Sequence, residues 1–187
     1  SVRKLVGDSM RSLTFIGAAV LMTAMLALSG CGTVTVQEEY SFGEMTMHAG
    51  NTQVLLFSPF ELGQAKIQGS DSTVYGNQDQ HLQITATYEQ AAGLTLDGAV
   101  DKAVAELSRL AEVSLTGRNV GQTTVHGGPA LTGDIEYILS AKGQKIPVVE
   151  RLLVFENQGY IWTVRYTYRR DDETGKAVTD FVFEKLQ

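Results

Sequence analysis

The stretch from residue 120 to residue 168 constrains the fold of this chain most, because strand-like segments follow one another there with only short turns between them. The segments are rich in β-branched and aromatic residues, and the short runs AKGQ and NQG separate them. Parallel neighbours would need a crossover of about a dozen residues or more. The stretch therefore predicts strands that pair antiparallel, each with the next, in one sheet.

Two segments with helical spacing flank these strands. Apolar residues recur every three or four positions over residues 96–110, and Thr95 stands where an N-cap side chain is preferred. The same spacing returns over residues 176–186, with Val178, Phe181, Val182 and Leu186 on the apolar side. The acidic residues 171–173 precede this second segment and suit the positive end of a helix dipole. Both segments are therefore predicted to be helices.

Two further strand signals precede the first predicted helix. Residues 54–57 form an apolar run that predicts a buried strand, which Pro59 limits to an edge or an end. Residues 72–89 alternate apolar and polar side chains around a predicted turn at 76–79, as a hairpin does. The order of elements predicts the α+β class, with a mainly antiparallel β-sheet and helices packed on it.

Residues 10–32 carry a separate signal for export. Arg11 gives this segment a positive start, residues 13–28 carry no charge, and small residues stand before Cys31. The pattern resembles a bacterial lipoprotein signal peptide, which implies cleavage before Cys31 and a diacylglycerol on its thiol. The alternative is an uncleaved helical anchor, but the apolar run is shorter than the roughly 20 residues that a membrane span needs.

These signals divide the chain into four predicted parts. Residues 1–9 are interpreted as an extension upstream of the start, and residues 10–30 as the signal peptide. Residues 31–51 are the lipidated Cys and a tether that ends in, or pairs as, a strand. Residues 52–187 form a single α+β domain, a length that can bury a sizeable core.

The charge and the single Cys limit what the exported part binds. Removal of residues 1–30 takes away Arg3, Lys4, Arg11 and Asp8, so the formal net charge falls from −6 to −8. Nucleic acid is therefore not an expected partner, because phosphate binding depends on clustered Lys and Arg. Acylation of Cys31 would leave no thiol for a disulfide, a zinc site or a nucleophile.

The residue after Cys31 bears on the expected location. Gly32 stands there in place of the Asp that would suggest retention at an inner membrane. We therefore expect the chain to lie on the extracytoplasmic side of a bacterial cell envelope, attached to the membrane through the lipid on Cys31. The membrane would be the outer one where two are present, and otherwise the outer face of the cell membrane.

Three short motifs carry a resemblance to a known family. They are residues 125–130 with the strand that contains Tyr137, the hairpin into residues 159–164, and the closing helix at 181–186. With the order of elements they resemble the Mog1/PsbP-like α/β/α sandwich, and within it the DcrB-type bacterial lipoproteins, over residues 52–187. Ser58-Pro59-Phe60 matches the family's first strand only loosely. The resemblance implies a non-enzymatic accessory protein that binds other proteins.

Residues with reactive or metal-binding side chains are scattered. His48, His81 and His126 stand singly, without HExxH spacing, so no metal site is expected. Residues 127–129 are interpreted as a turn, because a strand and not a helix follows them. No motif for an activated serine is present in residues 31–187, and neither a catalytic residue nor a cofactor is predicted.

The segment 161–168 carries the one predicted contact surface. Alternation places Trp162, Val164, Tyr166 and Tyr168 on one face, predicted to be core, and Ile161, Thr163, Arg165 and Thr167 on the other. If helices leave that second face open, Arg165 with Arg151 and Glu150 would form a mixed polar surface for a partner.

Three functions follow as hypotheses. The first is a membrane-anchored, non-enzymatic envelope lipoprotein whose domain binds another envelope or secreted protein. The alternative is a carrier or sensor that holds a small apolar or lipid ligand in an enclosed pocket between sheet and helix. A third is an envelope hydrolase, which predicts a cleft with ionisable groups of perturbed pKa in mutual reach.

Overall fold

The computed structural model describes residues 40–66 and 73–186 of the chain. The predictions for residues 1–9, for the signal peptide at 10–30 and for Cys31 lie outside these described residues. Within them, two helices and nine strands form: α3 (Leu96–Ser108), α4 (Glu173–Lys185), β1 (Gly43–Ala49), β2 (Thr52–Ser58), β3 (Gly63–Lys66), β4 (Thr73–Gln78), β5 (Gln83–Gln90), β6 (Val113–Val125), β7 (Gly128–Ala141), β8 (Gln144–Asn157) and β9 (Tyr160–Arg169). Neither helix is long and apolar enough to cross a membrane.

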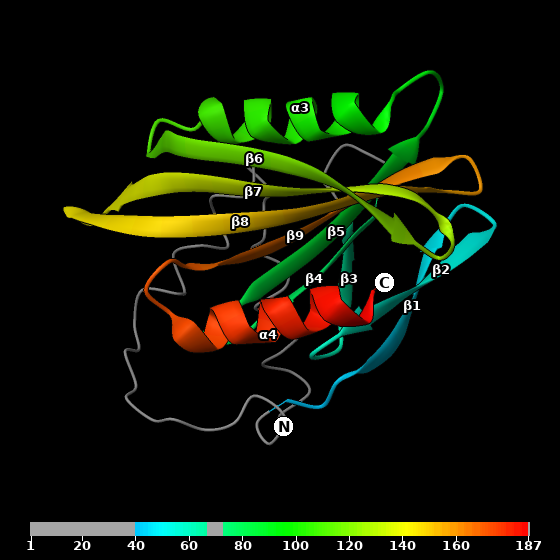
Figure 1. Cartoon of the computed structure of the whole chain (residues 1–187), viewed down its shortest axis with the longest axis horizontal. Coiled ribbons are helices and arrows are strands. Elements are labelled where there is room, and N and C mark those ends of the chain that lie inside the picture. Colours follow the sequence, from blue (N-terminus) through cyan, green and yellow to red (C-terminus); the bar gives the residue numbers. More distant parts are fainter. Residues whose placement is uncertain (1–39, 67–72, 187) are drawn as a thin grey trace.

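The strands form a seven-stranded sheet in the order β3-β4-β5-β9-β8-β7-β6 and a separate β1–β2 hairpin. Every paired neighbour in both sheets runs antiparallel. Helix α3 covers one face of the large sheet, while α4 and the β1–β2 hairpin lie on the other face (Figure 1). The predicted α+β class, a mainly antiparallel sheet with helices packed on it, is confirmed.

Three tight turns connect β6 to β9, as the sequence predicted. In each turn two residues have positive φ, which is the type I′ geometry that matches the twist of a two-stranded ribbon. The second residue is always glycine, which adopts this conformation without steric cost. The turns are His126-Gly127, Lys142-Gly143 and Gln158-Gly159. A turn is therefore present next to the one predicted at residues 127–129, but His126 and Gly127 form it, and Gly128 and Pro129 already belong to β7.

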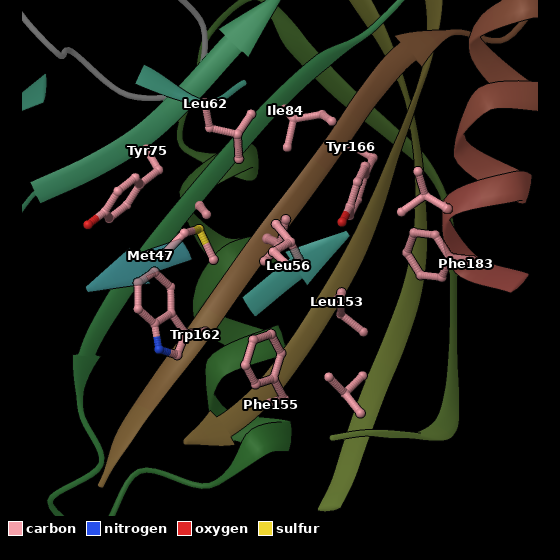
Figure 2. Packing of buried hydrophobic residues seen from close by; sticks show 14 of the residues in the cluster. Met47, Leu56, Leu62, Tyr75, Ile84, Leu153, Phe155, Trp162, Tyr166 and Phe183 are labelled. Atoms are coloured by element: carbon pink, nitrogen blue, oxygen red, sulfur yellow. The ribbon is translucent and has the colours of Figure 1, made fainter. Parts of the chain in front are cut away.

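The two faces of the sheet carry two hydrophobic cores. The core on the α4 side contains Trp162, Tyr166, Phe155 and Leu56, which are buried between the sheet, α4 and the hairpin (Figure 2). The predicted core face of β9, which carries Trp162, Val164, Tyr166 and Tyr168, is confirmed. The core beneath α3 is made by residues that include Val100, Leu107, Ile135, Tyr137 and Leu152.

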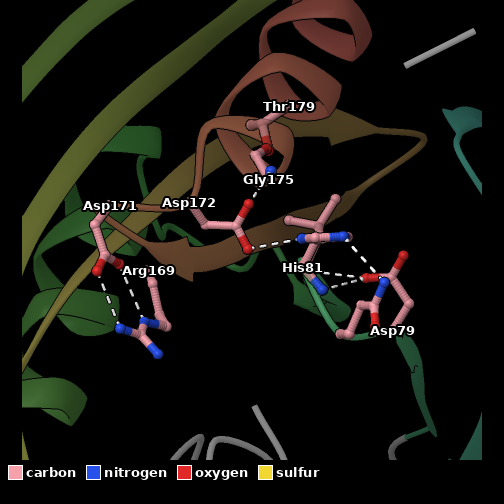
Figure 3. Close-up of polar contacts among 9 residues, drawn as sticks. Asp79, His81, Arg169, Asp171, Asp172, Gly175 and Thr179 are labelled. Atoms are coloured by element: carbon pink, nitrogen blue, oxygen red, sulfur yellow. Dashed lines mark hydrogen bonds and ion pairs between the residues drawn. The ribbon is translucent and has the colours of Figure 1, made fainter. Parts of the chain in front are cut away.

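The start of α4 is held by the acidic run that the sequence placed there. Asp172 is the N-cap, and its Oδ1 accepts a hydrogen bond from the backbone N–H of Gly175 at 2.9 Å (Figure 3). The other oxygen of Asp172 lies 2.8 Å from Nδ1 of His81, so the cap also ties α4 to the start of β5. A Cβ on Gly175 would lie 2.6 Å from the His81 carbonyl oxygen, which explains glycine at this contact.

Some boundaries differ from the sequence expectations. The β4–β5 turn lies at residues 79–82 and not at 76–79, because the carboxylate of Asp79 accepts hydrogen bonds from the backbone N–H groups of His81 and Leu82. Strand β1 lies at the end of the segment 31–51, where the tether was expected to end in, or pair as, a strand. It pairs with β2 and buries Met47 and Ala49, so the packed part of the chain begins before residue 52.

Candidate functional site

An open depression of about 330 Å³ lies between the C-terminal half of α4 and strands β6, β7 and β8. Thr123, Thr132, Arg151 and Leu153 line it from the sheet. The helix contributes the groups that line its other side, namely Asp180, Phe183, Glu184 and Leu186. We call this depression the α4 groove. It lies beside the contact of α4 with β9, over the neighbouring outer strands of the same face.

Arg151 is the central side chain of the α4 groove. Its Nη1 donates to Oδ1 of Asp180 at 2.6 Å, and its Nε lies 3.3 Å from Oδ1 of Asp134. The guanidinium carbon lies 4.1 Å from the centroid of the Phe183 ring, within the range of a cation–π contact. The side chain is held from three sides yet keeps 23% of its surface exposed. It therefore presents an oriented, partly accessible cation.

Acidic groups outnumber basic groups around this cation. The carboxylates of Asp134, Asp180 and Glu184 lie at the groove, against Arg151 and the Lys176 ammonium, which lies 2.6 Å from Asp180. Nearby, burial raises the pKa of Tyr168 to about 12, with the positive charge of Arg151 acting in the opposite direction. The tyrosine is thus a neutral hydroxyl at physiological pH, and the groove carries a net negative charge.

A second polar cluster lies beneath α3. Arg165 on β9 donates to Oε1 of Glu150 on β8 at 2.9 Å and to Oε2 of Glu106 on α3 at 2.6 Å. Glu150 has no exposed surface, whereas 48% of the Glu106 side chain is exposed. Burial raises the pKa of Glu150, and the neighbouring Arg165 partly offsets that effect. The cluster fastens α3 to the sheet from inside the molecule.

The structure separates the three residues predicted to form one contact surface. Glu150 and Arg165 lie on the face that α3 covers, while Arg151 lies on the α4 face. Because Glu150 and Arg151 are neighbours on one strand, their side chains must point to opposite faces. The expected open polar surface is therefore wrong: α3 covers that face, and of the three only Arg151 lines the α4 groove.

The histidines found in the sequence serve separate local contacts. His81 pairs with Asp172, His126 lies edge-on to Phe155 at 5.8 Å, and the backbone N–H of His48 donates to the Tyr75 hydroxyl. Within residues 40–66 and 73–186, no three His, Cys, Asp or Glu side chains are grouped so as to hold a metal ion.

Sequence reasoning missed the residues that complete the α4 groove. Asp180 stands four residues after Lys176, a spacing that signals an ion pair on a helix surface but does not show what lies beside it. Phe181 was assigned to the apolar side of α4, yet it is only half-buried, and Phe183 packs against Arg151 in its place. Which of these two rings packs against the sheet depends on how α4 lies on it.

Comparison with known proteins gives structural similarities only. No family model and no curated protein matches this chain. It is similar to the solution structure of cyanobacterial PsbP (CyanoP) from Synechocystis sp. PCC 6803, with 17% identity over 84% of this chain and 96% of that one, at a TM-score of 0.49. It is also similar to LpqN, a protein involved in cell envelope biogenesis of Mycobacterium tuberculosis, with 16% identity over 80% and 90% of the two chains and a TM-score of 0.43.

A third similarity is to a Pseudomonas aeruginosa protein of unknown function, with 9% identity over 77% of this chain and 96% of that one, at a TM-score of 0.45. PsbP is also the family that the sequence motifs resemble. All three TM-scores lie below 0.5, so these similarities support no conclusion about what the chain binds.

Proposed function

We propose that this chain is a lipid-anchored, non-enzymatic protein of the bacterial cell envelope that binds a segment of another envelope or secreted polypeptide in the α4 groove. The observation that carries this proposal is the placement of Arg151. The groove holds it over Phe183 between two carboxylates, in an open site on a packed domain. Arg and aromatic side chains are enriched at protein interfaces and dominate their binding energy.

The groove also indicates the chemistry of the partner segment. Leu186, which is half-buried, and the 8% of Phe183 that is exposed offer apolar surface, while Asp134 and Glu184 add negative charge beside it. A segment that combines an apolar side chain with Lys or Arg would match both features. Charge complementarity of this kind raises the association rate and excludes partners of the same sign.

The two other hypotheses receive less support. A carrier of an apolar ligand needs an enclosed apolar pocket, whereas the α4 groove is open and lined by five charged or hydroxyl-bearing side chains besides its apolar ones. A hydrolase needs ionisable groups that a substrate can reach. Glu150, whose pKa burial raises, has no exposed surface beneath α3, so a substrate cannot reach it in this conformation.

Site-specific photo-crosslinking in intact cells tests the proposal. A photoreactive residue in place of Thr132, on the groove floor, is expected to give one reproducible crosslinked polypeptide. The same residue in place of Ser108, exposed on α3 at the opposite face, is expected to give none. Equal products at both positions, or no product at Thr132, would contradict the proposed groove.

Charge reversal gives a matched second test. Asp134→Lys removes an acidic group beside Arg151, and Asp101→Lys removes an exposed acidic group that pairs with Arg118 on the other face. Each change breaks one surface ion pair and shifts the net charge by the same amount. The Thr132 crosslink is expected to weaken with Asp134→Lys and to stay unchanged with Asp101→Lys; the same loss in both variants would refute groove-specific recognition.

A further inference from the structure

A cluster of half-buried aromatic rings lies where the described chain begins. Phe42 stacks on Phe57 of β2 with ring centroids 5.7 Å apart, and it meets Phe181 of α4 edge-on at 4.6 Å. Phe57 and Phe181 are 6.1 Å apart, and Tyr40 lies 6.1 Å from Phe42. We call these four residues, together with Leu55, the aromatic strip. Three separate segments of the chain therefore contribute rings to one place on the surface.

The strip faces outward from the β1–β2 hairpin. Along β2, Val54 and Leu56 are buried on the inner side, while Leu55 is 41% exposed and Phe57 is half-buried on the outer side. The partners of Leu55 and Phe57 across the hairpin are Thr46 and Glu44, both exposed. Leu55 is also the most exposed large apolar side chain of the described residues. The strip thus offers partly exposed apolar surface, largest at Leu55, that no helix or strand of the described residues fully covers.

The edge of the strip carries a cation. The ammonium of Lys185 lies 5.4 Å from the centroid of the Phe181 ring, and its side chain is exposed. Aromatic rings beside Lys are the groups that settle at the boundary between acyl chains and headgroups, where the ring is buried and the ammonium reaches water and phosphate. The acidic neighbour on this face is Glu44, opposite Phe57.

The position of the strip in the chain points to the same environment. Tyr40, its first residue, stands nine residues after Cys31. Even a fully extended segment of that length spans no more than about 32 Å. If Cys31 carries the lipid, Tyr40 therefore lies within that distance of the bilayer, and the strip begins at the residue where the lipidated segment joins the described domain.

The aromatic strip and the α4 groove lie on different sides of α4. With 3.6 residues per turn, Phe181 and Phe183 project roughly 160° apart around the helix axis. Phe183 lines the groove against Arg151, whereas Phe181 joins Phe42 and Phe57. Contact of the strip with a surface therefore leaves the groove open to the surrounding solution.

We propose that the aromatic strip docks on the lipid surface and fixes the orientation of the domain, with the α4 groove directed away from the bilayer. This inference rests on the lipid anchor of the proposed function. The surface is one of zwitterionic headgroups, because the formal net charge of −8 without residues 1–30 opposes attraction to anionic lipid. Buried apolar area, and not charge, supplies the contact.

Nitroxide labels on the acylated protein, processed by cells that express the full chain, test the docking. Cys31 is the only Cys of the chain, so once it is acylated a new Cys can be labelled alone. Leu55→Cys and Thr46→Cys place labels on the strip side of the hairpin, and Leu115→Cys, at 38% exposure on edge strand β6, is the matched control. The protein is reconstituted in phosphatidylcholine vesicles, and the collision rates of each label with oxygen and with a water-soluble nickel complex are measured.

The labels at Leu55 and Thr46 are expected to favour oxygen over nickel several-fold relative to the label at Leu115. Strip labels that meet nickel as often as the control, on protein that floats with the vesicles, would overturn the docking and leave the anchor intact. Dipolar broadening between Leu55 labels would show a second copy on the strip and would also overturn it. Protein that does not float would refute the anchor, and the docking with it.

Discussion

Removal of Arg165 is expected to be among the most destabilising single changes in this domain. In Arg165→Met the carboxylate of Glu150 loses its hydrogen-bond partner at 2.9 Å and stays where no part of its surface reaches water. Breaking a buried ion pair from one side costs about 3–5 kcal/mol, because the remaining charge is neither paired nor hydrated. Glu106→Gln removes the charge of the other partner of Arg165. Because the Glu106 side chain is 48% exposed, this change should cost less than about 1 kcal/mol.

The cost of Arg165→Met should also depend on pH. Burial already raises the pKa of Glu150, and loss of the neighbouring cation raises it further. Between the unfolded pKa of about 4.3 and the folded value, the native state holds a proton that the unfolded state has released. Stability therefore falls as pH rises through this window, so Arg165→Met lowers the free energy of unfolding more at pH 8 than at pH 4.5.

Urea unfolding followed by circular dichroism measures both effects, with the free energy of unfolding of Arg165→Met, Glu106→Gln and the parent protein compared at the two pH values. The double variant Arg165→Met with Glu150→Leu should recover part of the loss, since it removes the stranded charge. A cost of Arg165→Met no larger than that of Glu106→Gln, or one that does not change with pH, would refute the buried pair as described here.

Three further changes test the packing around the helices. Asp172→Ala removes the N-cap of α4 and its contact with His81, and should lower the free energy of unfolding in urea by about 1–2 kcal/mol. Asp171→Ala, which removes an exposed ion pair with Arg169, should cost much less. Equal losses in the two variants would refute the cap. Gly175→Ala places a Cβ 2.6 Å from the His81 carbonyl oxygen and 2.9 Å from Cβ of Tyr168. The overpacking should lower the free energy of unfolding by about 1–3 kcal/mol. An unchanged midpoint of urea unfolding would contradict this contact. Thr95→Ala removes the side-chain acceptor of the Gly98 N–H at the start of α3 and should lower the thermal midpoint by an amount that corresponds to about 1 kcal/mol; no shift would show that the cap contributes nothing.

The sequence predicted the parts of the fold that local signals determine. The four consecutive antiparallel strands, the Gly-containing turns and the caps at Thr95 and Asp172 depend on residues that lie close together in the chain. The separation of Glu150 from Arg151 was also available, because neighbours on one strand point to opposite faces. The prediction of one shared surface overlooked that rule.

Other features depend on how distant elements pack together. Phe181 and Phe183 both fit an apolar helix. Only the packing of α4 on the sheet, where Phe183 contacts Arg151 of β8 and lies edge-on to Tyr166 of β9 at 5.1 Å, places Phe183 in the core. Glu106 gave no sign of its role, since its partner Arg165 lies 59 residues away. The α4 groove combines β6, β7, β8 and α4, and its shape follows from where the helix crosses the sheet. No local sequence pattern indicates where α4 crosses the sheet.

The state of Cys31 tests the central claim most directly, because the proposed location in the envelope and the docking of the aromatic strip both depend on it. The measurement is the mass of the N-terminal peptide of the protein recovered from the membrane fraction of cells that express the full chain. The account predicts a chain that begins at Cys31 and carries a diacylglycerol on its thiol. A chain that retains residues 1–30 and has an unmodified Cys31 would contradict it.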